Sequence, residues 1–195
     1  MFNSQAKQDE FVLDVLNYKR DGYFLEIGSQ HPIHTNNSYV LEHNFNWNGI
    51  MVEYDPQYEH LYKKYRTSNY IIKDARKIDY DKLLSDNSAP KNIDYLQIDL
   101  DVNNSSTIDT LLLLEESVFP KYTFKTVTFE HDIYTGNYFN TQIISRDVFK
   151  KHGYELVIKD RRINGDKFED WYIHSSYYNT LSQSFIDNIK EKYQN

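Results

Sequence analysis

Five short apolar segments of this chain each carry an acidic residue at or next to their end, and this recurrence constrains the fold more than any other feature. The first segment, Tyr23–Ile27, is a continuous apolar run around Glu26 rather than an alternating one, which is typical of a strand covered on both faces in a parallel sheet. The other four are Gly49–Glu53, Tyr70–Asp74, Tyr95–Asp99 and Thr126–Glu130. We expect each of the five segments to form a β-strand.

Segments with apolar residues at helical spacing separate the expected strands. Phe11, Val12 and Val15 share one face of a first helix, which Ser4 can cap. Further helices are expected over 36–45, 58–64, 105–112, 146–152 and after Asn179, and two closing strands over 154–159 and 171–174. This alternation predicts an α/β protein, a single domain over residues 1–195 with a short N-terminal helix and a seven-stranded, doubly wound, mostly parallel sheet.

Composition narrows the partners that such a domain can bind. Asp and Glu total 29 against 22 Lys and Arg, so the net charge of -7 disfavours nucleic acid and anionic membranes. No apolar run approaches the roughly 18 to 20 residues that span a bilayer, and the absence of cysteine fits a reducing compartment, so we expect a cytoplasmic protein. A small molecule or a glycan is the expected ligand, and a second subunit of a homo-oligomer can complete the pocket that binds it.

The acidic strand ends predict one ligand site. In an open parallel sheet, ligands bind beyond the carboxyl ends of the strands, so these acids should converge on one crevice. Gly28, directly after the first strand, allows a tight turn, and Glu53 stands where a carboxylate binds the ribose hydroxyls of a nucleoside. The loop over Gly28–Pro32 lacks a G-x-G-x-x-G pattern for phosphates. A cationic nucleoside such as S-adenosylmethionine therefore fits this crevice better than a dinucleotide.

Several spaced residues also resemble the FkbM family of S-adenosylmethionine-dependent methyltransferases. The resemblance covers roughly residues 4–160 and is strongest before Asp55, and its combination of positions is more specific than any single motif. The matching segments are Ser4-Gln5-x-x-Gln8-Asp9-Glu10-Phe11-Val12-Leu13, Gly22-Tyr23-Phe24-Leu25-Glu26-Ile27-Gly28, Asn37-Ser38-x-x-Leu41-Glu42-x-x-x-x-Trp47-x-Gly49-Ile50-x-Val52-Glu53 and Ile93-Asp94-Tyr95-Leu96-x-Ile98-Asp99.

This resemblance implies a class I methyltransferase fold, which is Rossmann-like, and methylation of an oxygen, commonly a sugar hydroxyl. It also implies which residues bind the cofactor. From the methionine half through the ribose to the adenine, they are Glu26, Gly28 and Ser29, then Glu53, then Asp74 and Ala75, with Asp99 at the end of the fourth strand.

Two stretches depart from the family pattern. Pro32 and Ile33 stand where relatives often have Asp-Gly, in the loop that faces the methionine half. The fourth strand is followed by Asp99-Leu100-Asp101-Val102-Asn103, where the common pattern is Asp-x-Glu-Gly. We therefore expect this chain to differ from its relatives on the acceptor side of the site.

Methyl transfer to an alcohol requires that the acceptor proton leaves, either to a general base or because a metal ion lowers the hydroxyl pKa. Asp99 and the run Glu130-His131-Asp132 follow the fourth and fifth strands and should be neighbours. His131 is the expected base, and Asp99 is expected to take part in catalysis with it. The carboxylates of Asp99 and Asp132 suit Mg²⁺ or Mn²⁺.

Two other functions stay open. Asp99-Leu100-Asp101 after an apolar strand matches the D-x-D with which many glycosyltransferases hold a metal ion and a nucleotide sugar. The third function is that of a non-catalytic, Rossmann-like binding module whose altered loop has lost the cofactor. Binding of a UDP-sugar without binding of S-adenosylmethionine indicates the glycosyltransferase. The absence of stabilisation by S-adenosylmethionine or S-adenosylhomocysteine indicates the non-catalytic module.

Overall fold

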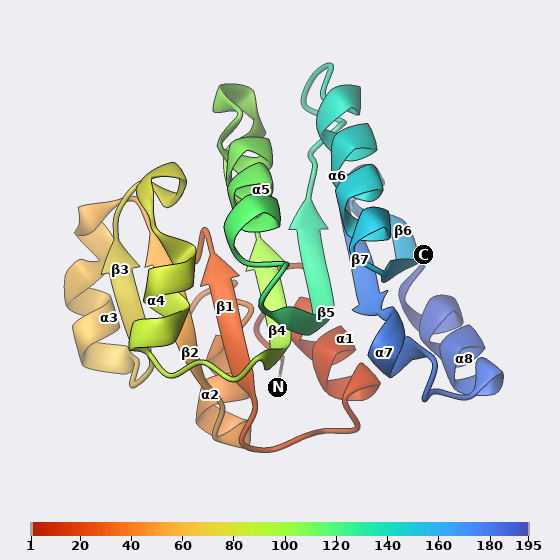
Figure 1. The fold of residues 1–195 in the computed structure, drawn as a ribbon, viewed down its shortest axis with the longest axis horizontal. Helices are drawn as coiled ribbons and strands as arrows, with labels where there is room; N and C mark the ends of the chain where they lie inside the picture. Colours follow the sequence, from red (N-terminus) through yellow and green to blue (C-terminus); the bar gives the residue numbers. More distant parts are fainter. Residues whose placement is uncertain (1, 195) are drawn as a thin grey trace.

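The computed structural model describes residues 2–194, which build a seven-stranded sheet flanked by helices (Figure 1). The strand order is β3-β2-β1-β4-β5-β7-β6. β1 to β5 pair in parallel, whereas β7 runs antiparallel to both of its neighbours. The predicted α/β fold with a mostly parallel sheet is confirmed. The strands are β1 Tyr23–Ile27, β2 Asn48–Glu53, β3 Asn69–Ile72, β4 Asn92–Ile98, β5 Thr123–Glu130, β6 Tyr154–Ile163 and β7 Asp166–His174.

Helices cover both faces of this sheet, which explains why its central strands are apolar on both sides. Successive side chains of a strand point to opposite faces, so Phe24 packs on one face and Leu25 on the other. The helices on the Phe24 face are α1 Gln8–Val15, α2 Tyr39–Phe45, α3 Glu59–Tyr65 and α8 Gln183–Tyr193. Those on the Leu25 face, in front in Figure 1, are α4 Tyr80–Asp86, α5 Ser106–Ser117 and α6 Phe139–Lys151.

Short helical turns follow several strands and fix the loops at their carboxyl ends. A side-chain carboxylate caps each of the three 3₁₀ turns by accepting a backbone N–H two residues ahead. The turns are η1 Pro56–Tyr58 after β2, η2 Ala75–Lys77 after β3 and η3 Val102–Asn104 after β4, and the α-helical turn α7 Ser175–Tyr178 follows β7.

Two helix starts differ from the prediction. α1 begins after Lys7, whose backbone is left-handed, and not after Ser4. The Ser4 hydroxyl instead donates to the Asp9 carboxylate at 2.5 Å and accepts from the Asp9 N–H at 3.4 Å. α6 begins at Phe139, well before the predicted Arg146. The prediction missed its first turns because they are partly exposed and show no buried apolar stripe. α4 was not predicted. Within residues 2–194, no helix is long and apolar enough to cross a membrane.

A buried ion pair holds the loop between β1 and α2. The Arg66 Nε atom lies 3.1 Å from Oε2 of Glu42, and both side chains are buried. The same guanidinium donates to the carbonyl oxygen of Pro32 at 3.1 Å, to Oδ1 of Asn36 at 3.0 Å and to the Ser38 hydroxyl at 2.7 Å. A residue after α3 therefore fixes the loop that begins at the end of the first strand.

Replacement of Arg66 by alanine should destabilise the protein by about 3–5 kcal/mol, because it leaves the Glu42 carboxylate buried without its partner. Urea unfolding followed by circular dichroism measures this change. Lys63→Ala is the matched control, since it removes the exposed pair with Glu59 on the neighbouring helix α3 and should leave the unfolding midpoint unchanged. Equal midpoints for wild type and Arg66→Ala would contradict the assigned role.

Candidate functional site

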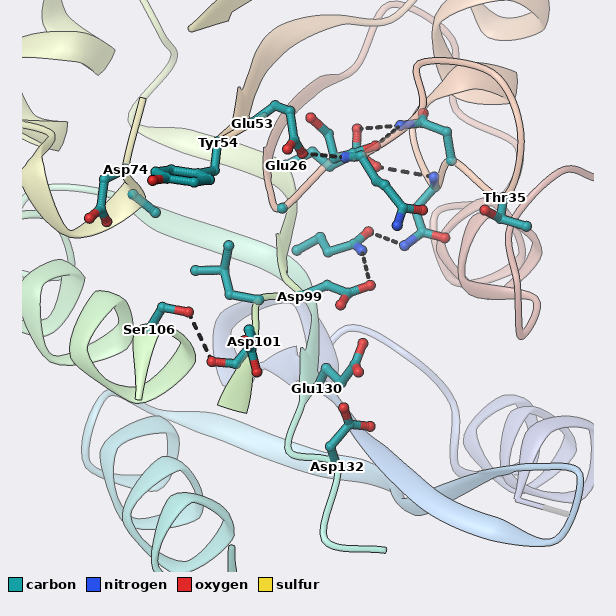
Figure 2. A pocket seen from close by; sticks show the side chains of 18 of the residues that line it. Glu26, Thr35, Glu53, Tyr54, Asp74, Asp99, Asp101, Ser106, Glu130 and Asp132 are labelled. Atoms are coloured by element: carbon teal, nitrogen blue, oxygen red, sulfur yellow. Dashed lines mark hydrogen bonds between the residues drawn. The ribbon is translucent and has the colours of Figure 1, made fainter. Parts of the chain in front are cut away.

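A cavity of about 680 Å³ lies at the carboxyl ends of β1, β2, β4 and β5 (Figure 2). Its volume is in the range of small-molecule sites. All the acids predicted to bind cofactor or metal contribute to its wall, together with the predicted glycine, serine and alanine. These lining residues are Glu26, Gly28, Ser29, Glu53, Asp74, Ala75, Asp99 and Asp132. The predicted convergence of the acidic strand ends is therefore confirmed.

Gly28 permits the turn that forms the floor of this cavity. Its φ of +87° lies in the left-handed region, and a Cβ atom there would lie 1.6 Å from the carbonyl oxygen of Asp99. The Gly28 N–H donates to the carbonyl of Val52 at 2.9 Å, and the Asp99 N–H donates to the carbonyl of Ile27 at 2.9 Å. The ends of β1, β2 and β4 therefore meet at a position where only glycine fits.

Glu53 is oriented by backbone amides. Its Oε2 accepts from the Gln30 N–H at 2.6 Å, and its Oε1 accepts from the Asp55 N–H at 2.8 Å. Each carboxylate oxygen has two lone pairs, so both keep one for a ligand in the cavity. This fixed, bidentate acceptor at the end of β2 can bind two adjacent hydroxyl groups.

Glu26 and Ser29 line the cavity, but their polar atoms are largely used within the protein. Glu26 accepts from Asn36 Nδ2 at 3.2 Å, from the Asn37 N–H at 3.1 Å and from the Ser38 hydroxyl at 2.6 Å. Burial raises the pKa of the Glu26 carboxyl, although the nearby Arg66 guanidinium and these donors oppose the shift. The Ser29 hydroxyl lies 2.6 Å from that of Tyr62 and 3.2 Å from the Val52 carbonyl oxygen. Both residues shape the loop after β1.

The other end of the cavity lies beside η2. Asp74 accepts from the Arg76 N–H at 3.0 Å and pairs with the Arg76 guanidinium at 2.9 Å. The hydrogen bond from Arg76 holds the pKa of this carboxyl below its ordinary value. Tyr54, largely exposed, lies with its ring between Glu53 and Asp74 in Figure 2. Sequence reasoning missed Tyr54, although an aromatic residue directly after the acid of β2 was a usable signal.

Three carboxyl groups form a row from β4 to the loop after β5, namely Asp99, Glu130 and Asp132 (Figure 2). Glu130 interacts with both Asp99 and Asp132. Burial raises the pKa of Asp99, and burial together with repulsion from Asp99 raises that of Glu130 well above its ordinary value. Burial and the neighbouring carboxyl groups therefore favour the protonated form of Glu130. The sequence analysis expected Glu130 near Asp99 but gave it no role.

His131 does not line the cavity, so the structure does not place the predicted base beside the other site residues. It is fully buried, and its Nε2 lies 3.6 Å from Oδ1 of Asp170 and 3.8 Å from Oδ1 of Asp160. The physical reason is the backbone beyond the end of β5: His131 and Asp132 both donate their N–H to the Phe168 carbonyl, and the His131 side chain is turned toward Asp160 and Asp170. The expected neighbourhood of Asp99 and the acids after β5 is correct, but the expected histidine in it is not.

Arg146 occupies the centre of this second cluster. It pairs with Asp160 at 2.6 Å and with Asp170 at 2.7 Å. Burial acts to raise the pKa of Asp170, but the adjacent His131 and the hydrogen bonds from Arg146 outweigh it and lower that pKa to about 2. His131, Asp160 and Asp170 are the one acid and histidine group of three within residues 2–194 whose ligand atoms lie within 4.8 Å of one another. Because Arg146 pairs with both carboxylates and Lys167 pairs with Asp160 at 3.3 Å, we interpret the cluster as structural.

The predicted Mg²⁺ or Mn²⁺ at Asp99 and Asp132 stays a prediction. Carboxylate oxygens are suitable ligands for either ion. However, within residues 2–194 no third acid or histidine joins Asp99 and Asp132 in a group as tight as that around His131. Glu130 lies between the two in Figure 2, and burial raises its pKa. The arrangement therefore suits proton transfer better than it suits a closed metal site.

The fold, compared with solved structures, is that of class I methyltransferases. Human methyltransferase-like protein 13 in complex with SAH matches with a TM-score of 0.56 and 14% identity, over 95% of this chain and 89% of that one. The Dnmt2 methyltransferase of S. pombe matches with a TM-score of 0.52 and 11% identity, over 78% of this chain and 49% of that one. No family model and no curated protein matches the chain. At such identities the likeness establishes the Rossmann-like methyltransferase fold.

Gly28→Ala should cost more than about 3 kcal/mol of stability, because the new methyl group clashes with the Asp99 carbonyl and alanine is also forced into a left-handed backbone conformation. Gly165→Ala is the matched control. Its φ of +95° is also left-handed, but a Cβ there meets no atom within 4 Å, so only about 1–2 kcal/mol should be lost. Chemical denaturation of both variants measures the difference. Equal losses would show that the close approach to Asp99 is unimportant.

Proposed function

We propose that this protein is an S-adenosylmethionine-dependent O-methyltransferase that acts on a sugar hydroxyl or a similar small hydroxylated acceptor. The observation that carries the proposal is the Glu53 carboxylate, which two backbone amides orient toward a cavity of about 680 Å³ next to the Gly28 turn. In a methyltransferase fold, an acid at this strand end is suited to the ribose of a nucleoside. The residues that resemble the FkbM family support the hydroxyl acceptor.

The residues around the cavity fit S-adenosylmethionine along its length. Glu53 would hold the two ribose hydroxyls, and the ring of Tyr54 with Asp74 and Ala75 would bind the adenine. The loop that begins at Gly28, held by Glu26, would bind the methionine half. A net negative wall suits a ligand that carries a sulfonium. The cofactor, when bound, supplies an electrophilic methyl group, and the protein aligns the acceptor with it.

The acceptor hydroxyl must lose its proton as its oxygen bonds to the methyl carbon. We assign that proton to Asp99, whose carboxyl has a raised pKa and lies at the cavity wall. A base is most effective when its pKa lies near the working pH, and burial moves Asp99 in that direction. Glu130 lies beside Asp99, and its raised pKa favours a neutral carboxyl group next to the Asp99 carboxylate. His131 has no part in this step.

The glycosyltransferase alternative has less support. Asp101 lines the cavity, but its Oδ1 accepts from the Asn103 N–H at 2.9 Å and its Oδ2 accepts from Asn104 Nδ2 at 3.2 Å. Those contacts cap η3 and account for the carboxylate without a metal ion. The non-catalytic alternative predicts that neither S-adenosylmethionine nor its product binds.

Titration calorimetry with S-adenosylhomocysteine should give micromolar binding to the wild-type protein. Glu53→Ala should weaken it at least about tenfold, since each hydrogen bond to a charged group contributes about 1.5–3 kcal/mol. Glu59→Ala, on exposed α3, is the control and should bind like wild type. No binding to the wild type would refute the methyltransferase proposal.

Asp99→Asn should lower kcat at least about 100-fold, the typical loss when a general base is removed. In the wild type, kcat should fall as pH drops through the raised pKa of the Asp99–Glu130 pair, at a midpoint above about 4, the ordinary carboxyl value. His131→Gln should retain this acid limb. An acid limb that disappears with His131 would contradict the assignment, and activity that EDTA abolishes and Mg²⁺ restores would favour the metal alternative.

A further inference from the structure

We propose that the hydroxylated acceptor carries a protonated amino group, which the row Asp99, Glu130 and Asp132 binds, as in an amino sugar or an amino polyol. This inference rests on the proposed function and names the substrate class of the same site. It is carried by the charges along the cavity wall and by two buried oxygen atoms that lack a donor.

The cavity wall is acidic almost without compensation. Arg76 is the one lysine, arginine or histidine among its lining residues within positions 2–194, and it is paired with Asp74 at the adenine end. The opposite end, which we call the acceptor side, is lined by Gln5, Thr35, Asn37 and the carboxyl row. Asp74 and Tyr54 lie at one side of Figure 2, while Thr35, Asp99, Glu130 and Asp132 lie away from them.

Two buried oxygen atoms on the acceptor side have no hydrogen-bond partner. One is Oδ1 of Asn37, a residue that is only 3% exposed. The Asn37 Nδ2 donates to Oε1 of Gln97, and Gln97 Nε2 donates to Oδ2 of Asp99 at 3.3 Å. The Asn37 and Gln97 side-chain amides therefore both donate to neighbouring side chains, and Oδ1 of Asn37 accepts no hydrogen bond. The other atom is Oδ1 of Asp132.

A ligand rich in N–H and O–H donors satisfies such a surface. An ammonium group offers three donors and no acceptor, so it matches carboxylate and amide oxygens without creating a new unpaired group. Its positive charge is also attracted to the carboxyl oxygens of the row, and in a partly buried site this attraction is stronger than in water. The cofactor's sulfonium would face Asp99 and Glu130, so Asp132, at the end of the row, is the acid that still needs a cation.

Other acceptor classes fit less well. A phosphorylated or carboxylated acceptor would bring negative charge against three acids with no arginine or lysine on the acceptor side to receive it. A neutral sugar would supply donors but leave the charge of the row uncompensated. A divalent cation is the remaining competitor, but within residues 2–194 Asp99 and Asp132 form no tight group with a third acid or histidine.

The test uses the full-length protein saturated with S-adenosylhomocysteine and four probes of similar size: glucosamine, N-acetylglucosamine, glucose and glucuronate. Calorimetry with EDTA present should show glucosamine binding at least tenfold more tightly than glucose or N-acetylglucosamine, with no binding of glucuronate. Asp132→Asn should reduce the preference for glucosamine to less than threefold while the affinity for S-adenosylhomocysteine stays unchanged. Asp81→Asn, an exposed acid on α4, should keep the preference.

Several results would overturn the inference. They are equal affinities for glucosamine and glucose, binding of glucuronate, no detectable binding of glucosamine, and binding of glucose that appears only when Mn²⁺ or Mg²⁺ replaces EDTA. Methyl transfer from S-adenosylmethionine to each probe gives an independent ranking that should follow the same order. Because S-adenosylhomocysteine is titrated first, its failure to bind refutes the proposed function, whereas normal binding without amine preference refutes only this inference.

Discussion

The turn at Gly28 lies so close to the main chain of Asp99 that no side chain fits between them, and the rest of the site depends on this contact. It brings the ends of β1 and β4 together, so that the loop after β1 and the acids after β4 and β5 face one cavity. A β1 turn that lay farther out would leave Glu53 and Asp99 without a shared ligand. The cavity thus follows from backbone packing, and the side chains then determine its chemistry.

Two groups of polar residues have different roles around that cavity. On the β1 side, Glu26 and the Arg66–Glu42 pair are fully occupied with protein donors and acceptors, so they make the loop rigid. On the β4 and β5 side, Asp99 accepts a hydrogen bond from Gln97 Nε2 at 3.3 Å, but Oδ1 of Asp132 has no partner, and burial raises the pKa of Asp99 and Glu130. Satisfied groups give the site its shape, while unsatisfied ones give it reactivity. The same division explains why His131, enclosed by Asp160, Asp170 and Arg146, belongs to the structural part.

Much of this architecture follows from the sequence, because buried parallel strands need continuous apolar segments and their carboxyl ends meet at one edge. The strands and the convergence of Glu53, Asp74 and Asp99 could therefore be predicted. His131 was chosen as the base on its chemical type alone, whereas the backbone after β5 turns its side chain toward Asp160 and Asp170 and away from the cavity. α6 was predicted too short because Phe139 and Ile143 are exposed, so hydrophobic spacing does not mark its first turns. The unpaired oxygen of Asn37 depends on long-range partners, which no local pattern reveals.

A crystal structure of the protein with S-adenosylhomocysteine tests the central claim most directly. The account predicts the ribose hydroxyls on the two oxygens of Glu53, the adenine beside Tyr54 and Asp74, and the sulfur atom facing the Asp99–Glu130 pair across an open acceptor side. A ligand bound elsewhere, or one whose ribose does not contact Glu53 while the Gly28 turn stays as described, would contradict it.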